Sequence, residues 1–591
     1  MWNGRWQTPV RELLDRWLRL GYKPLQVFKR EWFPTAVLIL DSTNVDRSRP
    51  RKSLYQSVSS HVANDKILDL ATAQMRDWDV VIIGGGMGGG SAAYALANKG
   101  YKVLLIEKGL ASFEGTGEGV EIEQEDPEAR LANGKWPKKV SAQVDGSLSD
   151  IWAPLGCGLG GSSLLYGAAL QRLRSDDLEP GTAPNGDSID WPFRYSDLER
   201  YYKEAEKLYS VCGTNDPLES DSDSDLAPPP AMCEADQHFF QEFRNAGLNP
   251  YRLHVAVKYV EGCQECGGHI CKYACKRDSL NSCIVPALKT GNLFATERAE
   301  AMRLDADENG VTAAAVKQYG GDYTVRAKVF ALAAGAYFTP VLLLRSKSES
   351  WPEGLANSSG LVGKNLMFHA SDFIAFWPKR KCSRLGPNKT IALRDLYNVD
   401  GHKLGEFQST GLTADYGNVL YALRLLFDQS RLNKLTPLRH LLRIPAYFTS
   451  RFLGVATVFA TIVEDFPYQD NRVLVDESRP SGMRFEYSVK QEFRSRVLEM
   501  RRRVRKELSS LRSIPMNIGV ALNYGHPCGT CKAGNDPATS VLDKDCKAHE
   551  LDNLYVVDSS FTPTSGGTNP GLTIAANALR VADAIDKKLS Q

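Results

Sequence analysis

The chain has 591 residues, of which 43% are hydrophobic and 24% charged, a composition typical of a globular protein with more than one domain. Lys and Arg number 72 and Asp and Glu 70, so the net charge of +2 offers no basic surplus for nucleic-acid binding. No uncharged apolar run reaches the roughly 20 residues of a membrane-spanning helix.

The N-terminal residues 1–74 differ from the rest of the chain, because they mix Trp, Arg and Pro with short apolar pieces. They lack the basic start, apolar centre and small-residue cleavage site of a secretory signal. We therefore expect a cytoplasmic protein, with a periplasmic or membrane-associated location through a partner as the alternative. The role of residues 1–74 stays open: they form an extension, or the protein starts at Met75.

The first regular elements follow Met75. Residues 80–83, after Asp79, form an apolar run of Val and Ile, residues 91–98 favour a helix, and residues 103–106 form a second apolar run. Two such runs on either side of a helix predict a β–α–β unit with parallel, buried strands.

A glycine cluster joins the first strand to the helix. Gly84, Gly86 and Gly89 fit GxGxxG, in which the first glycine makes the turn, the second admits a pyrophosphate and the third lets the helix pack on the strand. The helix N-terminus then offers free N–H groups to phosphates. Glu107, directly after the second strand, suits ribose hydroxyls better than a 2′-phosphate, so the unit predicts FAD or NAD.

Two later segments have the composition of further strands in the same sheet. Residues 328–333, which precede a helix at 340–345, and residues 553–558 are apolar runs that end at a turn. The cofactor domain is therefore expected to be assembled from distant parts of the chain. The division that we predict is a cofactor-binding domain of residues 75–175, 290–346 and 521–591 and a substrate-binding domain of residues 176–289 and 347–520.

The C-terminal part carries a series of motifs. His526 begins HPCGTCKAG, which is followed by NDP, SVLD and, from Ser565, SGGTNPGLTI. With these motifs the chain resembles the glucose–methanol–choline (GMC) family of flavoprotein oxidoreductases, whose pattern HxxGTCxMG is met except that Ala533 replaces Met. The resemblance covers residues 78–588 in the right order and includes LGGSS at 159–163 and VGKNLM at 362–367.

The resemblance implies a fold and a cofactor. The fold is an α/β, Rossmann-like FAD-binding domain with an α+β substrate domain built on an antiparallel sheet, in the two-domain architecture of p-hydroxybenzoate hydroxylase. FAD would bind along the glycine turn and Glu107. The other cofactor-binding residues that the resemblance implies are Gly160, Gly161, Ser162, Asp558, Asn569 and Pro570.

The resemblance also implies a reaction, the oxidation of the CH–OH group of a small alcohol, sugar, polyol or sterol. His526 would be the base and Asn569 its partner across the substrate hydroxyl. A neutral imidazole, with an ordinary pKa of about 6.5, suits removal of the hydroxyl proton. A flavin-containing lyase or decarboxylase of the same fold, and a redox-inactive binding protein, are the alternatives. Oxygen, a quinone or an acceptor protein could take the electrons.

Five of the twelve cysteines gather in residues 263–283. Disulfides, a zinc site and an iron–sulfur cluster each explain such a cluster. The segment resembles the 3Fe-4S segment of membrane-linked GMC sugar dehydrogenases, with Cys266, Cys271 and Cys275 as the matching ligands. Departures from that pattern occur at Glu265, Lys276 and Arg277.

The segment 424–451 combines basic and apolar residues. Its only acid is Asp428, whereas its basic residues besides His are Arg424, Arg431, Lys434, Arg439, Arg443 and Arg451. It is expected either to cover the substrate domain as a solvated helical face, or to contact a membrane surface or a redox partner.

Overall fold

The computed structural model describes residues 65–113, 125–219, 224–261, 263, 265–271, 273–413, 416–428, 435–454, 456–517 and 519–591, all within one compact unit. Residues 1–64 of the predicted extension lie outside the described residues. Residues 65–74 pack on the body: Ile67 bridges to Ala295, and the short helix α3 (Leu70–Ala73) buries Leu70 and Ala73 completely.

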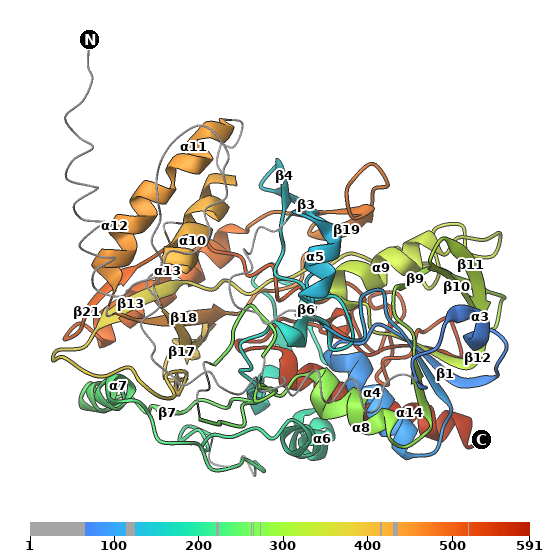
Figure 1. The fold of residues 1–591 in the computed structure, drawn as a ribbon, viewed down its shortest axis with the longest axis horizontal. Helices are drawn as coiled ribbons and strands as arrows, with labels where there is room; N and C mark the ends of the chain where they lie inside the picture. Colours follow the sequence, from blue (N-terminus) through green and yellow to red (C-terminus); the bar gives the residue numbers. More distant parts are fainter. Residues whose placement is uncertain are drawn as a thin grey trace, which may run out of the picture. The chain divides into compact units, whose positions relative to one another are not determined.

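A five-stranded parallel sheet carries the cofactor motifs (Figure 1). Its strand order is β22 (Leu554–Val556), β12 (Ala327–Leu332), β1 (Trp78–Ile83), β2 (Val103–Ile106) and β8 (Leu293–Ala295). The apolar runs predicted from the sequence form four of these strands. Strand β1 is central because its side chains are buried on both faces, as in most parallel sheets.

Helix α4 (Met87–Asn98) begins four residues before the predicted start. Its first turn holds three glycines, which helix propensity disfavours. Close packing explains them: a Cβ on Gly88 would lie 1.8 Å from the Val557 carbonyl oxygen, and one on Gly89 would lie 2.0 Å from that of Gly84. The helix therefore approaches two strand ends more closely than any other residue type allows.

Helix α9 (Gly335–Arg345) follows β12 and also begins earlier than predicted, with Pro340 inside it. Proline cannot donate to the carbonyl four residues before it. That carbonyl, on Ala336, instead accepts a hydrogen bond from Thr530 Oγ1 at 2.8 Å. The GTC motif thus stabilises a helix from another part of the chain.

The second large sheet is antiparallel and has six strands. Their order is β21 (Arg512–Pro515), β13 (Phe373–Trp377), β18 (Thr457–Val463), β17 (Gly405–Thr413), β14 (Ile391–Leu393) and β7 (Tyr251–Arg252). Helices α7 (Glu234–Asn245) and α13 (Gln491–Glu507) share an aromatic core with it, centred on Phe239, Phe459 and Phe493. The predicted fold class, a Rossmann-like part with an antiparallel substrate part, is confirmed.

Four smaller sheets complete the strand pairing in the described residues. Two of them are single pairs, β5 (Gly181–Thr182) with β6 (Ser188–Ile189) and β15 (Asn398–Val399) with β16 (His402–Lys403), and the other two are larger. One contains β9 (Ala299–Ala306), β10 (Val311–Gln318) and β11 (Gly321–Val325). The other joins β3 (Val140–Val144) and β4 (Ser147–Ile151) to β19 (Arg472–Val475) and β20 (Met483–Tyr487), and so combines both predicted domains. The domain boundaries stay predictions.

The remaining helices are α5 (Pro127–Ala132), α6 (Tyr195–Leu208), α8 (Val285–Leu288), α10 (Tyr416–Asp428), α11 (Thr436–Leu441), α12 (Arg443–Leu453) and α14 (Gly571–Leu589). Within the described part of the chain, no helix combines the length and the apolar character needed to cross a bilayer.

Candidate active site

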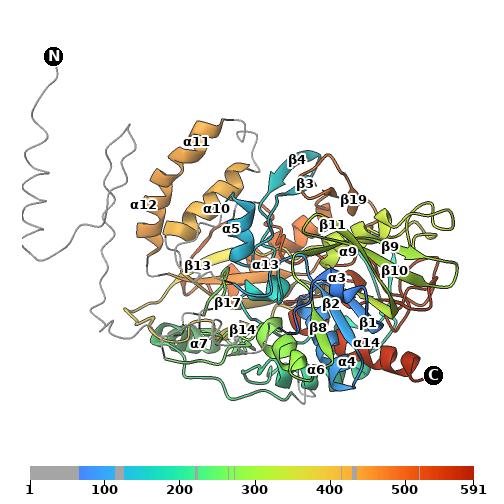
Figure 2. The ribbon, with the colours of Figure 1, turned by 45° about the vertical axis from the view of Figure 1, so that its right-hand side comes forward.

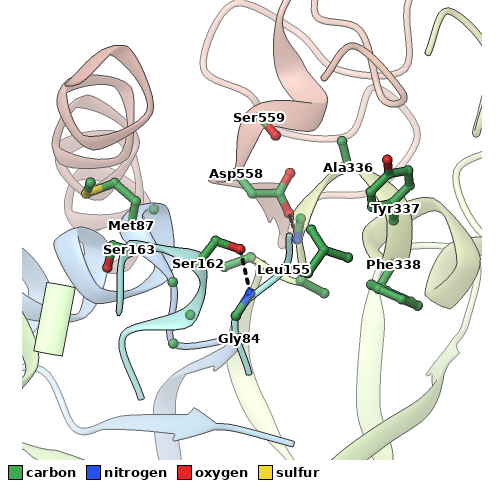
Figure 3. Close-up of a pocket in the computed structure, with 18 of the residues that line it drawn as sticks. Gly84, Met87, Leu155, Ser162, Ser163, Ala336, Tyr337, Phe338, Asp558 and Ser559 are labelled. Carbon is green, nitrogen blue, oxygen red and sulfur yellow. Dashed lines mark hydrogen bonds between the residues drawn. The ribbon is translucent and has the colours of Figure 1, made fainter. Parts of the chain in front are cut away.

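One cavity contains most of the residues that the sequence singled out. It runs from the turn at Gly84–Gly88 and Glu107, past Ser162, to His526 and Asn569. Figure 3 shows Met87, Ser162 and Asp558 around it. Helices α4 and α14 both begin at this cavity, and neither N-terminus has a side-chain cap, so both direct unpaired N–H groups and the positive end of a helix dipole there.

The glycine turn has the shape of a cofactor cradle. Gly84 has φ +108°, which favours glycine, and a Cβ there would lie 2.3 Å from the Ala333 oxygen. A Cβ on Gly86, by contrast, would meet only the Gly161 Cα, at 4.0 Å. Gly86 thus leaves open space where a pyrophosphate would approach the helix N-terminus, and the cradle fits a dinucleotide.

Glu107 lies at the end of β2, as predicted, and is buried. Its Oε2 accepts from Gly85 N at 2.8 Å, and its Oε1 accepts from Gly109 N at 2.8 Å and from Gly158 N at 3.1 Å. The carboxylate therefore ties the glycine turn to the 158–162 loop and still lines the cavity.

The predicted flavin loop follows directly. Gly160 and Gly161 have φ +113° and +51°, and Gly160 N donates to Gly85 O at 2.9 Å. Ser162 Oγ accepts from Gly156 N at 3.1 Å. Backbone bonds thus hold this loop against the glycine turn, so both line one wall of the cavity.

Asp558 caps the short helix that follows β22 and lines the cavity. Its Oδ1 accepts from Ser560 N at 2.8 Å, and its Oδ2 accepts from Gly335 N at 2.8 Å and Thr339 Oγ1 at 2.5 Å. Burial raises the pKa of this carboxyl above its usual value, and these donors oppose the rise. Asp558 thus joins the start of α9 to β22 beside the cavity.

His526 stands at the other end of the cavity, and a second histidine lies against it. His526 Nδ1 is 3.3 Å from His369 Nδ1, and the two rings meet edge to face. His369 is fully buried, and its Nε2 faces the carbonyl oxygens of Ser565 and Gly566 at 3.1 and 2.9 Å. His369 was not predicted from the sequence; its position two residues after the VGKNLM motif was the available signal.

The contacts of His369 set the proton positions on His526. Carbonyl oxygens only accept, so His369 carries its proton on Nε2 and leaves Nδ1 as an acceptor. His526 must then donate from Nδ1, because two lone pairs would repel at this distance. The Asn523 amide, also 3.3 Å from His526 Nδ1, has Ser371 Oγ as its acceptor at 3.5 Å. His526 Nε2 is thereby left unprotonated and able to take a proton.

Both histidines are neutral near pH 7. Burial lowers the pKa of His526 to about 3, and repulsion from His369 and Lys389 adds to the lowering. Burial likewise lowers the pKa of His369 to about 4. A neutral imidazole is the form that a general base requires.

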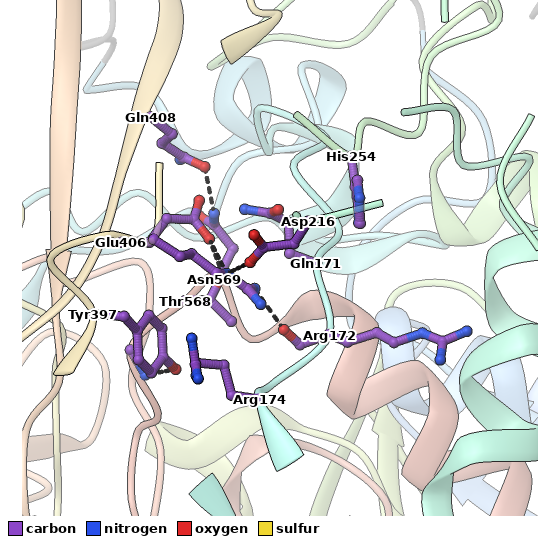
Figure 4. Close-up of polar contacts among 12 residues, drawn as sticks. Gln171, Arg172, Arg174, Asp216, His254, Tyr397, Glu406, Gln408, Thr568 and Asn569 are labelled. Carbon is purple, nitrogen blue, oxygen red and sulfur yellow. Dashed lines mark hydrogen bonds and ion pairs between the residues drawn. The ribbon is translucent and has the colours of Figure 1, made fainter. Parts of the chain in front are cut away.

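Asn569 lies on the turn before α14 and is held by strand β17 (Figure 4). Its Nδ2 donates to Gln408 Oε1 at 3.0 Å, which leaves its second N–H free for a substrate oxygen. Two residues away along the strand, Glu406 Oε2 accepts from Thr568 Oγ1 at 2.9 Å and from Arg394 Nε at 3.2 Å. This buried network fixes the backbone on which Asn569 stands.

Lys389 is a further cavity residue that the sequence did not reveal. Its side chain is almost completely buried, and its ammonium donates to the Gly167 carbonyl. Burial lowers its pKa to about 8, so most of it stays charged at neutral pH. No local motif surrounds it, because the loop before β14 reaches the cavity only through the tertiary fold.

The cysteine segment packs beside the predicted flavin loop. Cys275 Sγ lies 3.2 Å from Cys271 Sγ and 3.5 Å from Cys263 Sγ, whereas Cys283 lies apart, 3.1 Å from Tyr209 OH. Lys276 Nζ ties the segment down through the carbonyls of Leu164, Cys266 and His269, each at 2.8 Å.

The metal predictions for this segment find no support. In the described residues, no group of three or more His, Cys, Asp or Glu side chains could hold a metal ion. The thiol separations of 3.5 and 3.2 Å are shorter than the roughly 3.8 Å edge of a tetrahedron with Zn–S bonds of about 2.3 Å. Thiolates bound to different irons lie farther apart still. All twelve cysteines are free thiols in the structure.

Comparisons with known proteins identify the family. Two family models described as GMC oxidoreductase match residues 78–371 and 467–578. The 6′′′-hydroxyparomomycin C oxidase of Streptomyces lividus is 30% identical over 87% of this chain and 92% of its own. The 2-methyl-1,2-propanediol dehydrogenase of Mycolicibacterium austroafricanum is 27% identical over 87% and 96%.

The fold has a counterpart among solved structures. Pyridoxine 4-oxidase from Mesorbium loti superposes with a TM-score of 0.57 at 20% sequence identity, covering 86% of this chain and 99% of that one. Fold, motif order and sequence relatives agree, and the chain belongs to the GMC oxidoreductase family.

Proposed function

We propose that this protein oxidises a CH–OH group with FAD as the hydride acceptor and His526 as the base. Family membership implies FAD, and the relatives named above are oxidases and a dehydrogenase, which gives no support to the lyase or decarboxylase alternative. The observation that carries the proposal is that one cavity joins the dinucleotide cradle to His526 and Asn569.

The protein's own groups suit the proton side of this reaction. His526 Nε2 accepts the hydroxyl proton, while His526 Nδ1–H continues to donate a hydrogen bond to His369 Nδ1. Asn569 donates its free amide N–H to the same substrate oxygen, and Gln408 keeps that amide oriented. Bound FAD supplies the oxidant that takes the hydride from carbon. Lys389 keeps the charge around His526 positive, which favours the alkoxide character of the transition state.

We infer that the substrate is small and hydroxyl-rich. Lys389, Asn569 and His526 present one ammonium, one amide and one imidazole to the substrate end of the cavity. Hydroxyl groups can satisfy these donors and acceptors, whereas a sterol would bury them without partners. The relatives that act on 6′′′-hydroxyparomomycin C and on 2-methyl-1,2-propanediol fit this class.

We infer that the acceptor meets the flavin directly. A 3Fe-4S centre would offer a one-electron exit, but thiol separations of 3.2 and 3.5 Å around Cys275 do not fit ligands of separate irons. Oxygen or a quinone can take two electrons without such a relay.

Anaerobic mixing of the FAD-loaded protein with diols, sugars, amino sugars and cholesterol tests the function. The account predicts bleaching of the flavin absorbance by at least one hydroxyl-rich compound and none by cholesterol. A compound that is turned over while the flavin stays oxidised would establish a lyase and contradict the proposal.

A further inference from the structure

The connection between β17 and β18 departs from the rest of the surface. It contains α10, α11 and α12, which stand together beside the antiparallel sheet in both views (Figures 1 and 2). Sixteen large hydrophobic side chains are exposed in the described residues, and nine of them lie between Tyr416 and Phe452. Exposed apolar residues scattered singly are ordinary, whereas such a concentration indicates an interaction surface.

Helices α11 and α12 form one continuous rod, because Leu442 between them keeps helical dihedrals, φ −59° and ψ −17°. One face of the rod is internal: Ala446 and Leu453 pack with Val419 of α10 and Val458 of β18. This packing explains why the rod is held in place, but it uses only one face.

The opposite face is also apolar, and it is exposed. Residues spaced three or four apart lie on one side of a helix. Leu438, Leu441, Ile444, Phe448 and Phe452 follow this spacing, and their exposed fractions run from 39% to 67%. We call these five residues the apolar ridge. In the part of the chain that the structure describes, nothing is seen to cover it.

Basic and aromatic groups border the ridge. His440, Arg443 and Arg451 are exposed on the same rod, and Arg451 Cζ lies 5.6 Å above the Tyr447 ring. At the C-terminal end of α12, Arg512 Cζ lies 4.5 Å from the centre of the Trp377 ring, and the Trp377 ring meets the Phe452 ring edge to face. Of the other predicted basic residues, Arg439 is half-buried on the rod, Arg424 is buried, and Arg431 and Lys434 lie outside the described residues.

We propose that the apolar ridge docks this protein on the surface of an anionic lipid bilayer. An apolar helix face inserts into the boundary between headgroups and acyl chains, while flanking Arg side chains meet lipid phosphates and Trp and Tyr occupy the interface. The near absence of acids from residues 416–453, where Asp428 is the only one, supplies the charge complementarity. The rod lies flat on the bilayer and does not cross it.

Docking would place the bilayer near a segment of the chain that also reaches the active-site cavity. Strand β17, which leads into α10, carries Gln408, the partner of Asn569. Beyond Gln408, the strand passes Gly411, where a Cβ in place of the glycine hydrogen would lie 3.0 Å from Lys389 Cβ. Strand β17 therefore links the helices that carry the apolar ridge to Asn569 and Lys389 at the substrate end of the cavity.

The test is flotation of the full-length, FAD-loaded protein with vesicles of phosphatidylglycerol and phosphatidylcholine, and with vesicles of phosphatidylcholine alone. The wild type is expected to bind the anionic vesicles at least tenfold more strongly. Phe448→Asp, and separately the pair Arg443→Glu and Arg451→Glu, should reduce binding at least tenfold. Leu385→Asp is the matched control, since Leu385 is 89% exposed but lies outside the rod, and it should bind like the wild type.

Other occupants of the ridge would give different results. No binding of the wild type to anionic vesicles, or equal binding by Phe448→Asp and Leu385→Asp, would overturn the proposal. A dimer in solution that Phe448→Asp dissociates would assign the ridge to a second copy. That outcome also contradicts lipid docking.

Discussion

The glycine end of the cavity and the histidine end are built in different ways. The glycine turn and Glu107 belong to one β–α–β unit, so neighbours in sequence are neighbours in space. The histidine end collects His526, His369, Asn569, Gln408 and Lys389 from five separate segments. The difference teaches that cofactor binding rests on local backbone geometry, whereas substrate chemistry rests on long-range side-chain contacts.

The largest effect is expected at the glycine end. In Gly84→Ala, the new Cβ would collide with the Ala333 carbonyl, so the cradle cannot close and the protein should contain almost no FAD. Gly100→Ala is the matched control, because Gly100 has a similar φ of +94° but open space around it. The ratio of flavin to protein absorbance measures the outcome; equal FAD content in both variants would show that the turn does not shape the cofactor site.

The same comparison explains what the sequence could predict. The strands around Gly84, and His526 and Asn569 as site residues, followed from local motifs and the family resemblance. The early start of α4 did not, because three glycines oppose a helix unless close packing overrides propensity. Lys389, which lines the cavity, and Gln408, which contacts Asn569, have no local signature, because only the folded chain brings them to the site. His369 had only its position two residues after VGKNLM as a signal. Cys283 shared the cysteine spacing but packs elsewhere.

At the histidine end, His369 should act as a positioning residue. His369→Leu removes the acceptor that orients the proton of His526, and the flavin reduction rate should fall by about 10- to 100-fold with FAD content unchanged. His369→Asn keeps an acceptor oxygen and should retain most of the rate.

Loss of the repulsion from His369 should also raise the pKa of His526, so the acid limb of the pH–rate profile should move upward in both variants. Equal rates in the Leu and Asn variants, with an unmoved acid limb, would reduce His369 to a packing residue.

A smaller effect is expected from Gln408. Gln408→Leu frees the Asn569 amide to rotate, and the reduction rate should fall by about three- to tenfold, while Gln408→Glu keeps the acceptor and most of the rate. Stopped-flow reduction at saturating substrate measures both. If Gln408→Leu matches the wild type, the turn before α14 orients Asn569 without help.

The pH dependence of stability gives the smallest effect. Burial lowers the pKa of His254 to about 3, of His369 to about 4 and of His526 to about 3, all below the unfolded value of about 6.5. Each of these histidines therefore binds fewer protons in the folded than in the unfolded chain between pH 6.5 and 4, so the stability that it contributes is fully present above pH 6.5 and falls on acidification. Burial raises the pKa of Asp236, Glu464 and Asp465 to about 7, and these carboxyls act in the opposite direction.

Between pH 7 and pH 5, the urea midpoint of His254→Gln should therefore fall less, or rise more, than that of the wild type. An equal change of the midpoint in both proteins would contradict the lowered pKa of His254.

The central claim is that His526 is the base, whereas residues at the glycine end of the same cavity hold the cofactor. Anaerobic single-turnover reduction of the flavin in His526→Ala tests this claim most directly. The account predicts full FAD content and a reduction rate about a hundredfold or more below that of the wild type, the usual scale for losing a general base. A variant that binds FAD and reduces it at the wild-type rate would contradict the claim.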